Sequence, residues 1–389
     1  MNFSKNKIFI ICLAVFLASC SGKKDSSLTE PNKKPKVKNT FNLKKSWSKN
    51  VGGSFKKDVR GFQISHDGET IYASTASGRM AAFDKTSGKK VWSKKSKKDL
   101  SAGINVGFKN VYVANNDGQV IAFDKASGKK KWQVQLKSEV LIAPVEAANI
   151  AIVRSQDGRI VGFNSETGEQ EWAIQRDLPN LSLRLDVAPV VAGPVAIIGL
   201  SNGQLLALDS KVGRGLWDIP ISVPNGVNEL ERMRDIAGQP LINDTTVYIN
   251  SFQGEVVSVD GSTRRLNWQQ KISSHQQMAE DVDYLYVTAS DSKIFALDKK
   301  TGETLWQNDS LLRRGVSAPA VVGNNILVFG NHGDMYFFNK NTGRLVGRFS
   351  FPGKRVIGAP IISTDKATNK DVIYALSDNG SIYSYLVEN

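Results

Sequence analysis

The chain has 389 residues, with 51 Lys and Arg against 37 Asp and Glu, which gives a formal net charge of +14. Such a basic balance raises the question of nucleic-acid binding. The lysines are spread over repeated turns without an aromatic platform, which argues against that class of partner. Only two cysteines are present, Cys12 and Cys20. Because Cys12 falls in a predicted leader, no internal disulfide is expected and the hydrophobic core must supply the stability.

The first 19 residues are typical of an export signal. Lys5 and Lys7 form a short positive region, and an uncharged apolar run follows over residues 8–17. That run of about ten residues is too short to span a bilayer of roughly 30 Å as a helix. It leads into Leu-Ala-Ser-Cys, which resembles a bacterial lipobox and implies acylation of Cys20. The alternative is an ordinary signal peptide with a chance cysteine.

The residue after this cysteine is Ser21. By analogy with lipoprotein sorting in Gram-negative bacteria, a residue other than Asp there implies transfer to the outer membrane. Two or more acyl chains give stable anchoring, which a single chain does not. The predicted location is therefore the periplasmic face of the outer membrane, held by lipid.

Residues 20–40 are predicted to form a lipidated, disordered tether, because they are rich in Lys, Ser, Asn and Pro and such a segment cannot repay the cost of ordering. We interpret the basic charge of this tether and of the repeat turns as a solvated surface near anionic lipid. The predicted organisation is a signal peptide over 1–19, the tether over 20–40 and one repetitive domain over 41–389.

One sequence phrase recurs through that domain. Residues 117–132 read DGQVIAFDKASGKKKW, related phrases begin at residues 77, 157, 202, 253, 291 and 332, and a truncated eighth begins at 379. The starts are separated by 38 to 51 residues, and a period of this size with alternating apolar residues indicates blades of four short strands. The predicted fold is all-β, an eight-bladed β-propeller of four-stranded antiparallel blades.

Each repeat predicts its strands in the same order. An inner strand often follows a small residue and Pro, as at Ala143-Pro144, and a second strand follows, such as residues 110–114. The D-G and N-G pairs that come next are typical of two-residue hairpin turns. The eighth repeat stops before its outer strand, so the strand around Trp47 is predicted to complete it and to close the ring between the two termini.

The regular spacing of tryptophan predicts a structural role, in which each ring packs between neighbouring blades. The alternative is an aromatic surface that binds a ligand. The seven residues are Trp47, Trp92, Trp132, Trp172, Trp217, Trp268 and Trp306. A repeated aspartate is interpreted as a turn-stabilising side chain and not as an acid catalyst. It occurs as Asp84, Asp124, Asp209, Asp260 and Asp298.

The phrase A-F-D-x-x-x-G-x-x-x-W resembles the tryptophan-docking repeat of quinoprotein alcohol dehydrogenases, which use pyrroloquinoline quinone and calcium on an eight-bladed propeller. Over nearly its whole length the chain is also similar to the BamB family, lipoprotein subunits of the outer-membrane β-barrel assembly (BAM) complex without that cofactor. This second resemblance implies a scaffold that binds the POTRA domains of BamA and assists the insertion of β-barrel proteins. Nascent outer-membrane proteins are further implied partners.

Two loops carry the specific part of this resemblance. The stretch NLSLR at 180–184 is similar to the family's L-S-L-R stretch, and GVNELERMRD at 226–235 is similar to its second BamA-binding loop. The residues implied in partner binding are Leu181, Leu183, Arg184, Arg234 and Asp235. The family commonly has a further Asp where this chain has Ala237, so one acidic contact is absent or replaced.

Repeat spacing alone points to the same loops. The intervals of 45 and 51 residues are consecutive, and their excess lies between Trp172 and Ala188 and between Trp217 and Pro240. Both connections run from an outer strand to the next inner strand, so they share one propeller face. Leucines beside an arginine are typical of an interface hot spot. The alternative is that the leucines pack beneath their own loop.

Little in the sequence predicts catalysis. His66, His275 and His332 fall in different repeats without metal-ligand spacing, and neither a phosphate-binding loop nor a G-x-S-x-G elbow occurs. The mature chain also lacks the adjacent cysteine pair of quinoproteins. We therefore expect no enzyme activity, no cofactor and no metal. A quinone-dependent dehydrogenase and a glycan-binding propeller are the alternatives.

Overall fold

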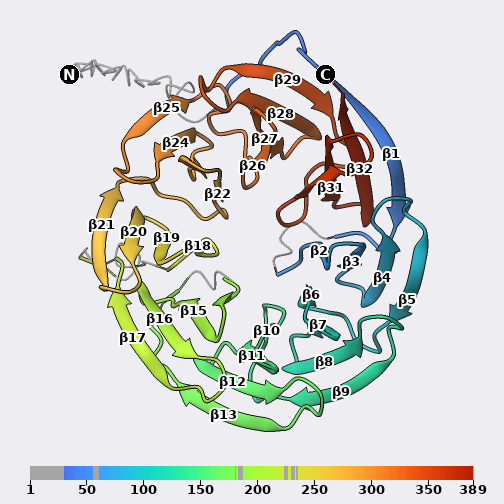
Figure 1. The fold of residues 1–389 in the computed structure, drawn as a ribbon, viewed down its shortest axis with the longest axis vertical. Coiled ribbons are helices and arrows are strands. Elements are labelled where there is room, and N and C mark those ends of the chain that lie inside the picture. The colour runs from blue at the N-terminus through green and yellow to red at the C-terminus, as the bar shows by residue number, and fades with distance from the viewer. Residues whose placement is uncertain are drawn as a thin grey trace, which may run out of the picture.

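The computed structural model describes residues 30–55, 61–179, 181–182, 187–222, 227–228, 233 and 235–388. In this part of the chain all regular structure is β, arranged as eight four-stranded antiparallel sheets. The sheets follow one another around a common axis as the blades of a propeller (Figure 1). The predicted all-β, eight-bladed architecture is confirmed. The described residues contain no helix with the length and hydrophobicity needed to cross a membrane.

We number the blades 1 to 8 in chain order, and each runs from an inner to an outer strand. Blade 1 contains β2 (Ser65–His66), β3 (Thr70–Ser74), β4 (Arg79–Asp84) and β5 (Lys90–Lys95). Blade 2 contains β6 (Ala102–Val106), β7 (Asn110–Ala114), β8 (Gln119–Asp124) and β9 (Lys130–Gln135). Blade 3 contains β10 (Val145–Ala147), β11 (Ile150–Arg154), β12 (Arg159–Asn164) and β13 (Gln170–Gln175). Blade 4 contains β14 (Val190–Ala192), β15 (Val195–Gly199), β16 (Gln204–Asp209) and β17 (Gly215–Pro220).

The second half of the ring repeats this plan. Blade 5 contains β18 (Leu241–Asn243), β19 (Thr246–Asn250), β20 (Val256–Asp260) and β21 (Arg265–Gln270). Blade 6 contains β22 (Ala279–Glu280), β23 (Tyr284–Thr288), β24 (Ile294–Asp298) and β25 (Thr304–Asn308). Blade 7 contains β26 (Ala320–Val322), β27 (Asn325–Gly330), β28 (Asp334–Asn339) and β29 (Leu345–Ser350). Blade 8 contains β30 (Ile361–Asp365), β31 (Lys370–Leu376), β32 (Ser381–Glu388) and β1 (Asn42–Asn50).

The ring is closed by the two ends of the chain. Strand β1 pairs antiparallel with β32, in a register that runs from Asn42 opposite Glu388 to Asn50 opposite Ser381. This pairing confirms the prediction that the strand around Trp47 completes the eighth blade. All strands of the eight sheets lie within residues 42–388, so a chain that begins at residue 21 contains the whole ring.

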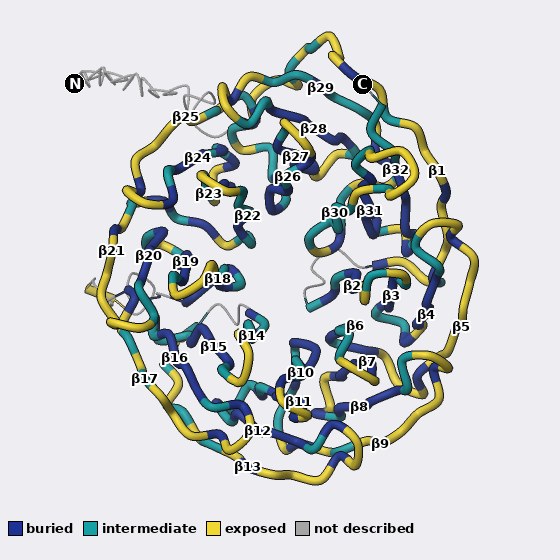
Figure 2. Tube along the Cα trace, viewed as in Figure 1, coloured by how far each residue is buried: buried dark blue, intermediate teal, exposed yellow. Residues whose placement is uncertain are grey.

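The core lies between the blades and not inside any one of them. The five residues of β7 are all buried, because both faces of this strand are covered by neighbouring blades, whereas in β9 only Trp132 is buried (Figure 2). One apolar cluster joins Tyr112 and Trp132 of blade 2 to Val153 and Phe163 of blade 3. Each blade therefore needs its neighbour to remove its apolar faces from water.

Most of the tryptophans connect one blade to the next in the same way. The indole Nε1 donates a hydrogen bond of 2.7–3.1 Å to the backbone carbonyl of the residue that follows the repeated Asp or Asn. These pairs are Trp47 with Lys85, Trp92 with Lys125, Trp132 with Ser165, Trp172 with Ser210, Trp268 with Lys299 and Trp306 with Lys340. Each of these six side chains therefore links its own blade to the next one.

Each of these rings also rests on the glycine of the neighbouring turn. Gly128 has a φ of 65°, a left-handed conformation that favours glycine. A Cβ added there would lie 2.8 Å from Cδ2 of Trp92. The repeated glycine therefore serves both the turn and the tryptophan that packs against it.

Two junctions depart from this pattern. In blade 5 the turn glycine is replaced by Arg264, which keeps the left-handed conformation with a φ of 62°. The tryptophan that faces it, Trp217, is only half-buried and makes no equivalent hydrogen bond among the described residues. A cavity of about 780 Å³ opens between blades 4 and 5. Apolar side chains on its wall include Ile219 and Leu266.

The other exception lies between blades 7 and 8. Blade 8 has no turn into its outer strand, because that strand is β1, and β29 correspondingly has Gly347 where a tryptophan would stand. Phe41 fills the space: a Cβ on Gly347 would lie 3.1 Å from its ring. The Phe41 ring also packs edge-on against Phe337, with centroids 4.9 Å apart.

The turns between the second and third strands are longer than predicted. Between β7 and β8 the turn has four residues, Asn115 to Gly118, and the amide of Gly118 bonds to the carbonyl of Asn115 at 3.1 Å. The Asn115 side chain accepts hydrogen bonds from the amides of Asp117 and Gln119, both at 3.0 Å. The prediction of two-residue hairpin turns is wrong here, because this side chain supports a wider turn in which only the glycine has a positive φ.

Residues 30–40, which we call the N-terminal strap, contact the ring. Arg348 donates from Nη1 to the carbonyl of Pro35 at 2.7 Å and from its amide to Oδ1 of Asn39 at 2.8 Å. Lys34 forms an ion pair of 2.6 Å with Asp334. Polar contacts to blade 7 therefore hold residues 34–39 against the ring. Residues 20–29 and Cys20 lie outside the described residues.

The two kinds of tryptophan should differ in their contribution to stability. Trp132→Ala removes a buried ring and its hydrogen bond and should lower the free energy of unfolding by about 3–5 kcal/mol. Trp217→Ala should cost clearly less, because that ring has no glycine to rest on. Denaturant unfolding of both variants and the parent measures the difference. Equal losses would contradict the role assigned to the turn glycine.

Candidate partner-binding face and central cavity

The two long loops lie on consecutive blade junctions. The first joins β13 to β14 and the second joins β17 to β18. In their described parts, large apolar side chains point to solvent: Leu178 is 43% exposed, Leu181 42% and Val227 92%. Apolar side chains left in water on two neighbouring loops are typical of a protein interaction surface. Leu178 and Val227 were not singled out from the sequence, although an apolar residue inside a polar loop is a readable signal.

The second loop is fixed where it returns to the ring. Ile236 is buried and packs so closely on Gly199 that a Cβ there would lie 2.4 Å from Cγ2 of Ile236. Its amide bonds to the carbonyl of Leu200 at 3.3 Å, and the amide of Ala237 bonds to the carbonyl of Asn250 at 3.0 Å. The loop therefore has a rigid base that bridges blades 4 and 5.

The first loop has a matching attachment at its start. Nη1 of Arg176 forms an ion pair of 3.5 Å with Oδ2 of Asp218 on β17. Asp218 lies on the strand that leads into the second loop. This ion pair therefore connects the beginnings of the two loops. Val187, at the far end of the first loop, is buried.

The predicted partner-binding residues fall into three groups. Leu181 is on the surface, as a contact residue requires. Asp235 is only 1% exposed and its backbone carbonyl accepts a hydrogen bond from the amide of Phe252 at 3.0 Å. Its carboxylate therefore lies inside the loop base, where it can position the loop. Leu183, Arg184 and Arg234 lie outside the described residues, and direct contact by any of the five stays a prediction.

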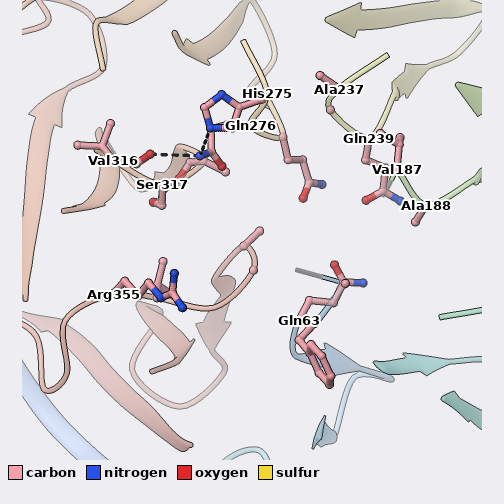
Figure 3. A pocket seen from close by; sticks show the side chains of 18 of the residues that line it. Gln63, Val187, Ala188, Ala237, Gln239, His275, Gln276, Val316, Ser317 and Arg355 are labelled. Atoms are coloured by element: carbon pink, nitrogen blue, oxygen red, sulfur yellow. Dashed lines mark hydrogen bonds between the residues drawn. The ribbon is translucent and has the colours of Figure 1, made fainter. Parts of the chain in front are cut away.

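Both loops end at a cavity on the propeller axis. This cavity, of about 430 Å³, is lined mostly by residues that precede the inner strands of the blades. Figure 3 shows Gln63, Gln239, His275 and Arg355 arranged around its open centre. Ala237 also lines it. The position where the family commonly has a second Asp therefore faces the axis in this chain.

The chemistry of this cavity is mainly that of neutral amides. Its amide side chains are Gln63, Asn105, Gln239, Gln276, Gln277 and Asn331. The only charged side chain among the lining residues is Arg355, and none of them is a carboxylate. Calcium prefers carboxylate and other oxygen ligands, so this donor set does not fit the calcium and quinone pair of the quinoproteins.

The three histidines lie in three different blades. His66 ends β2 and its Nδ1 accepts a hydrogen bond from the amide of Gly68 at 3.3 Å, as expected for a turn. His275 lines the central cavity beside Gln276, and His332 lies in blade 7. Among the described residues no group of His, Cys, Asp and Glu could hold a metal ion.

The repeated aspartates stabilise the turns into the outer strands. Oδ1 of Asp124 accepts hydrogen bonds from the hydroxyl and the amide of Ser127, and these bonds lower the pKa of the Asp124 carboxyl. In blade 5 the hydroxyl of Ser262 and the amide of Thr263 lower the pKa of Asp260 to about 2. These carboxyls are ionised and engaged with their own turns, which supports their interpretation as structural residues.

Comparison with known proteins decides the family. The sequence matches the family model described as outer membrane protein assembly factor BamB over residues 76–308 and 296–385. It is 38% identical to the outer membrane protein assembly factor BamB of Pseudomonas aeruginosa, over 97% of this chain and 98% of that protein. This chain belongs to the BamB family. The BamB of Alkalilimnicola ehrlichii is 32% identical over 40% of the chain.

Solved structures agree on the fold. BamB from Moraxella catarrhalis superimposes with a TM-score of 0.79 at 23% identity, covering 88% of this chain and 99% of that one. A quinohemoprotein alcohol dehydrogenase from Comamonas testosteroni gives a TM-score of 0.72 at 12% identity, covering 90% and 77%. BamB proteins and quinoproteins thus share a propeller, and the fold alone does not separate their activities.

Because of the turn aspartates, the thermal stability of the protein should decrease at acidic pH. Because their pKa values are lowered in the folded state, their contribution is complete above the ordinary value of 3.8 and is lost as the pH falls towards about 2. Exchange of Asp84, Asp124, Asp260 and Asp298 for Asn should keep the turns, since Asn339 already makes the same bonds in blade 7. The thermal midpoint of this variant should fall less between pH 4 and pH 2 than that of the parent. Parallel curves would contradict this role.

Proposed function

We propose that this chain is a non-enzymatic scaffold of the outer-membrane protein assembly machinery. It binds the POTRA domains of BamA through the face formed by the loops over 173–187 and 218–238. The observation that carries this proposal is the exposure of Leu178, Leu181 and Val227 on two neighbouring loops whose bases are fixed. Membership of the BamB family supplies the functional context.

The two loops form a binding surface whose base is held in place before a partner binds. Ile236 and the pair Arg176–Asp218 hold the loop bases, so little conformational entropy is lost when a partner binds. Exposed leucines offer apolar contact area. Arg184, with its planar guanidinium, can pair with a carboxylate through two hydrogen bonds. Buried Asp235 contributes by holding the second loop in place.

The central cavity supports the non-enzymatic part of the proposal. Its lining contains one imidazole, one guanidinium and several amides, and the aspartates of the repeats are engaged in turns. General acid–base catalysis needs a titratable group aimed at a reacting atom. The residues that line this cavity do not include two titratable groups placed side by side.

We further propose that acylated Cys20 holds the propeller on the periplasmic face of the outer membrane. A diacylated cysteine with a further amide-linked chain gives the two or more acyl chains that stable anchoring requires. The anchored scaffold positions POTRA domains near nascent barrel strands. The outer edges of blades 3 to 6 are available for strand pairing with such substrates.

The loop assignment is tested by binding to purified BamA POTRA domains. The parent, residues 21–389, should bind, and a variant with Leu181, Leu183 and Arg184 changed to Ala should lose at least about 2 kcal/mol, roughly a thirty-fold weaker Kd. Isothermal calorimetry or surface plasmon resonance measures the change, and thermal unfolding confirms that the variant folds.

The matched control removes two leucines and one arginine elsewhere. Leu266 and Leu305 are as exposed as Leu181, at 53% and 44%, and lie with Arg265 on the outer strands of blades 5 and 6. Their exchange for Ala should leave the Kd unchanged. Equal binding by both variants would place the BamA surface elsewhere, and failure of the parent to bind would reject the partner itself.

The anchor is tested by comparing the two cysteines of the chain. In cells that express the full chain, Cys20→Ser should abolish incorporation of labelled palmitate and recovery in the outer-membrane fraction. Cys12→Ser should preserve both, because that residue lies in the leader. Labelling that survives in the Cys20 variant would show that the lipobox assignment is wrong.

A further inference from the structure

The outer wall of the propeller is unevenly charged. The outer strands of blades 8, 1 and 2 are β1, β5 and β9, which follow one another along the rim (Figure 1). Together they carry eight exposed lysines and no carboxylate. These are Lys44, Lys45, Lys49, Lys90, Lys94, Lys95, Lys130 and Lys131. We call this surface the basic wall.

The remaining rim has no such excess. The five other outer strands, β13, β17, β21, β25 and β29, carry two cations, Arg265 and Arg348, and two anions, Glu171 and Asp218. All eight strands occupy the same place in their repeats. The excess on three adjoining blades is therefore not a requirement of the fold.

Within the part of the chain that the structure describes, most lysines of the basic wall lack an ion-pair partner. Lys131 forms an ion pair of 2.7 Å with Glu166, and the other seven have no ion pair within the described part of the chain. Lys90, Lys94 and Lys95 share with Arg79 a hollow of about 470 Å³ whose lining contains no carboxylate. Like charges gathered in this way repel one another unless an external anion lies over them.

The basic wall continues into the N-terminal strap. The strap lies against blade 7, next to blade 8, through Arg348 and Lys34. Its Lys33, Lys36 and Lys38 are also exposed and add positive charge beside blade 7. The strap begins beside the loop after β25, where the amide of Asn32 donates to the carbonyl of Leu312 at 3.0 Å, and it meets the basic wall where β1 begins.

We propose that the basic wall lies against the anionic headgroups of a phospholipid membrane, so that the propeller stands edge-on to the bilayer. Basic side chains near an anionic bilayer each strengthen binding about fivefold. With blades 8, 1 and 2 at the lipid, β17 and β21 lie on the other side of the ring (Figure 1). The loops at blades 4 and 5 then face away from the membrane, where a periplasmic partner can reach them.

Three features favour lipid over an acidic protein or a nucleic acid. The lysines are spread over three strands instead of being focused in one groove, as a broad anionic plane requires. Val91 is the only exposed large apolar residue on these strands, so an aromatic platform for bases is missing from them. Lysines along an exposed strand edge also discourage pairing with another protein strand.

The first test is co-sedimentation of residues 21–389 with vesicles of phosphatidylglycerol and phosphatidylcholine in equal parts. Changing Lys90, Lys94 and Lys95 to Gln should weaken binding about 100-fold, as three fivefold factors multiply. Glutamine fits these places, since the equivalent repeat positions are Gln170, Gln270 and Gln135. Binding of the parent should be lost in high salt and on vesicles of phosphatidylcholine alone.

The matched control removes three positive charges from the opposite rim. Lys211, Arg265 and Lys300 are exposed in blades 4, 5 and 6, and their exchange for Gln should weaken vesicle binding far less. Equal losses in both variants would overturn the proposal, because binding would then follow net charge alone. The proposal would also be overturned if the parent protein did not bind the vesicles but bound polyglutamate or duplex DNA through the same lysines. That polyanion would then be the favoured partner.

A second measurement reports the orientation of the propeller on the membrane. Ser93 on β5 and Gln307 on β25 both follow the repeat tryptophan by one residue and are both exposed. With an environment-sensitive fluorophore on Ser93→Cys or Gln307→Cys, only the first should respond to anionic vesicles. The same response at both positions would overturn the edge-on arrangement. Neither result depends on BamA, and the three-lysine variant should bind POTRA domains like the parent.

Discussion

The packing of a tryptophan from one blade on the turn glycine of the next is the contact on which the rest of this structure depends. A single blade has two apolar faces and cannot bury either alone. The Trp92 indole covers Gly128 and bonds to the carbonyl of Lys125, so it fixes the spacing and the angle between two blades at once. Repetition of this contact, with closure through β1 and β32, makes the ring a rigid platform.

The contact is missing at two blade junctions, and each of these junctions has an additional feature. Between blades 7 and 8 the chain ends meet, and Phe41 fills the place of a tryptophan. Between blades 4 and 5 Arg264 replaces the glycine and Trp217 is half-buried. That junction also bears the second long loop, whose base is held separately by the backbone hydrogen bonds of Ile236 and Ala237.

The ring also keeps the proposed protein-binding surface apart from the proposed lipid-binding surface. Exposed leucines and a valine lie on the loops of blades 4 and 5, whereas exposed lysines lie on the outer wall of blades 8, 1 and 2. Apolar contact suits a protein partner, and a broad positive wall suits lipid headgroups. A rigid propeller can hold both at once, because its blades cannot collapse onto one another.

The repeat phrase by itself determined the number of blades, the order of strands and the closure by the strand of Trp47, because local turn chemistry and period-two burial are written in consecutive residues. Tertiary structure alone decided the four-residue turns supported by Asn115, the burial of Asp235 and the contact of the strap with Arg348. It also decided that the lysines of three blades form one wall. These features depend on which residues, distant in sequence, the closed ring brings together.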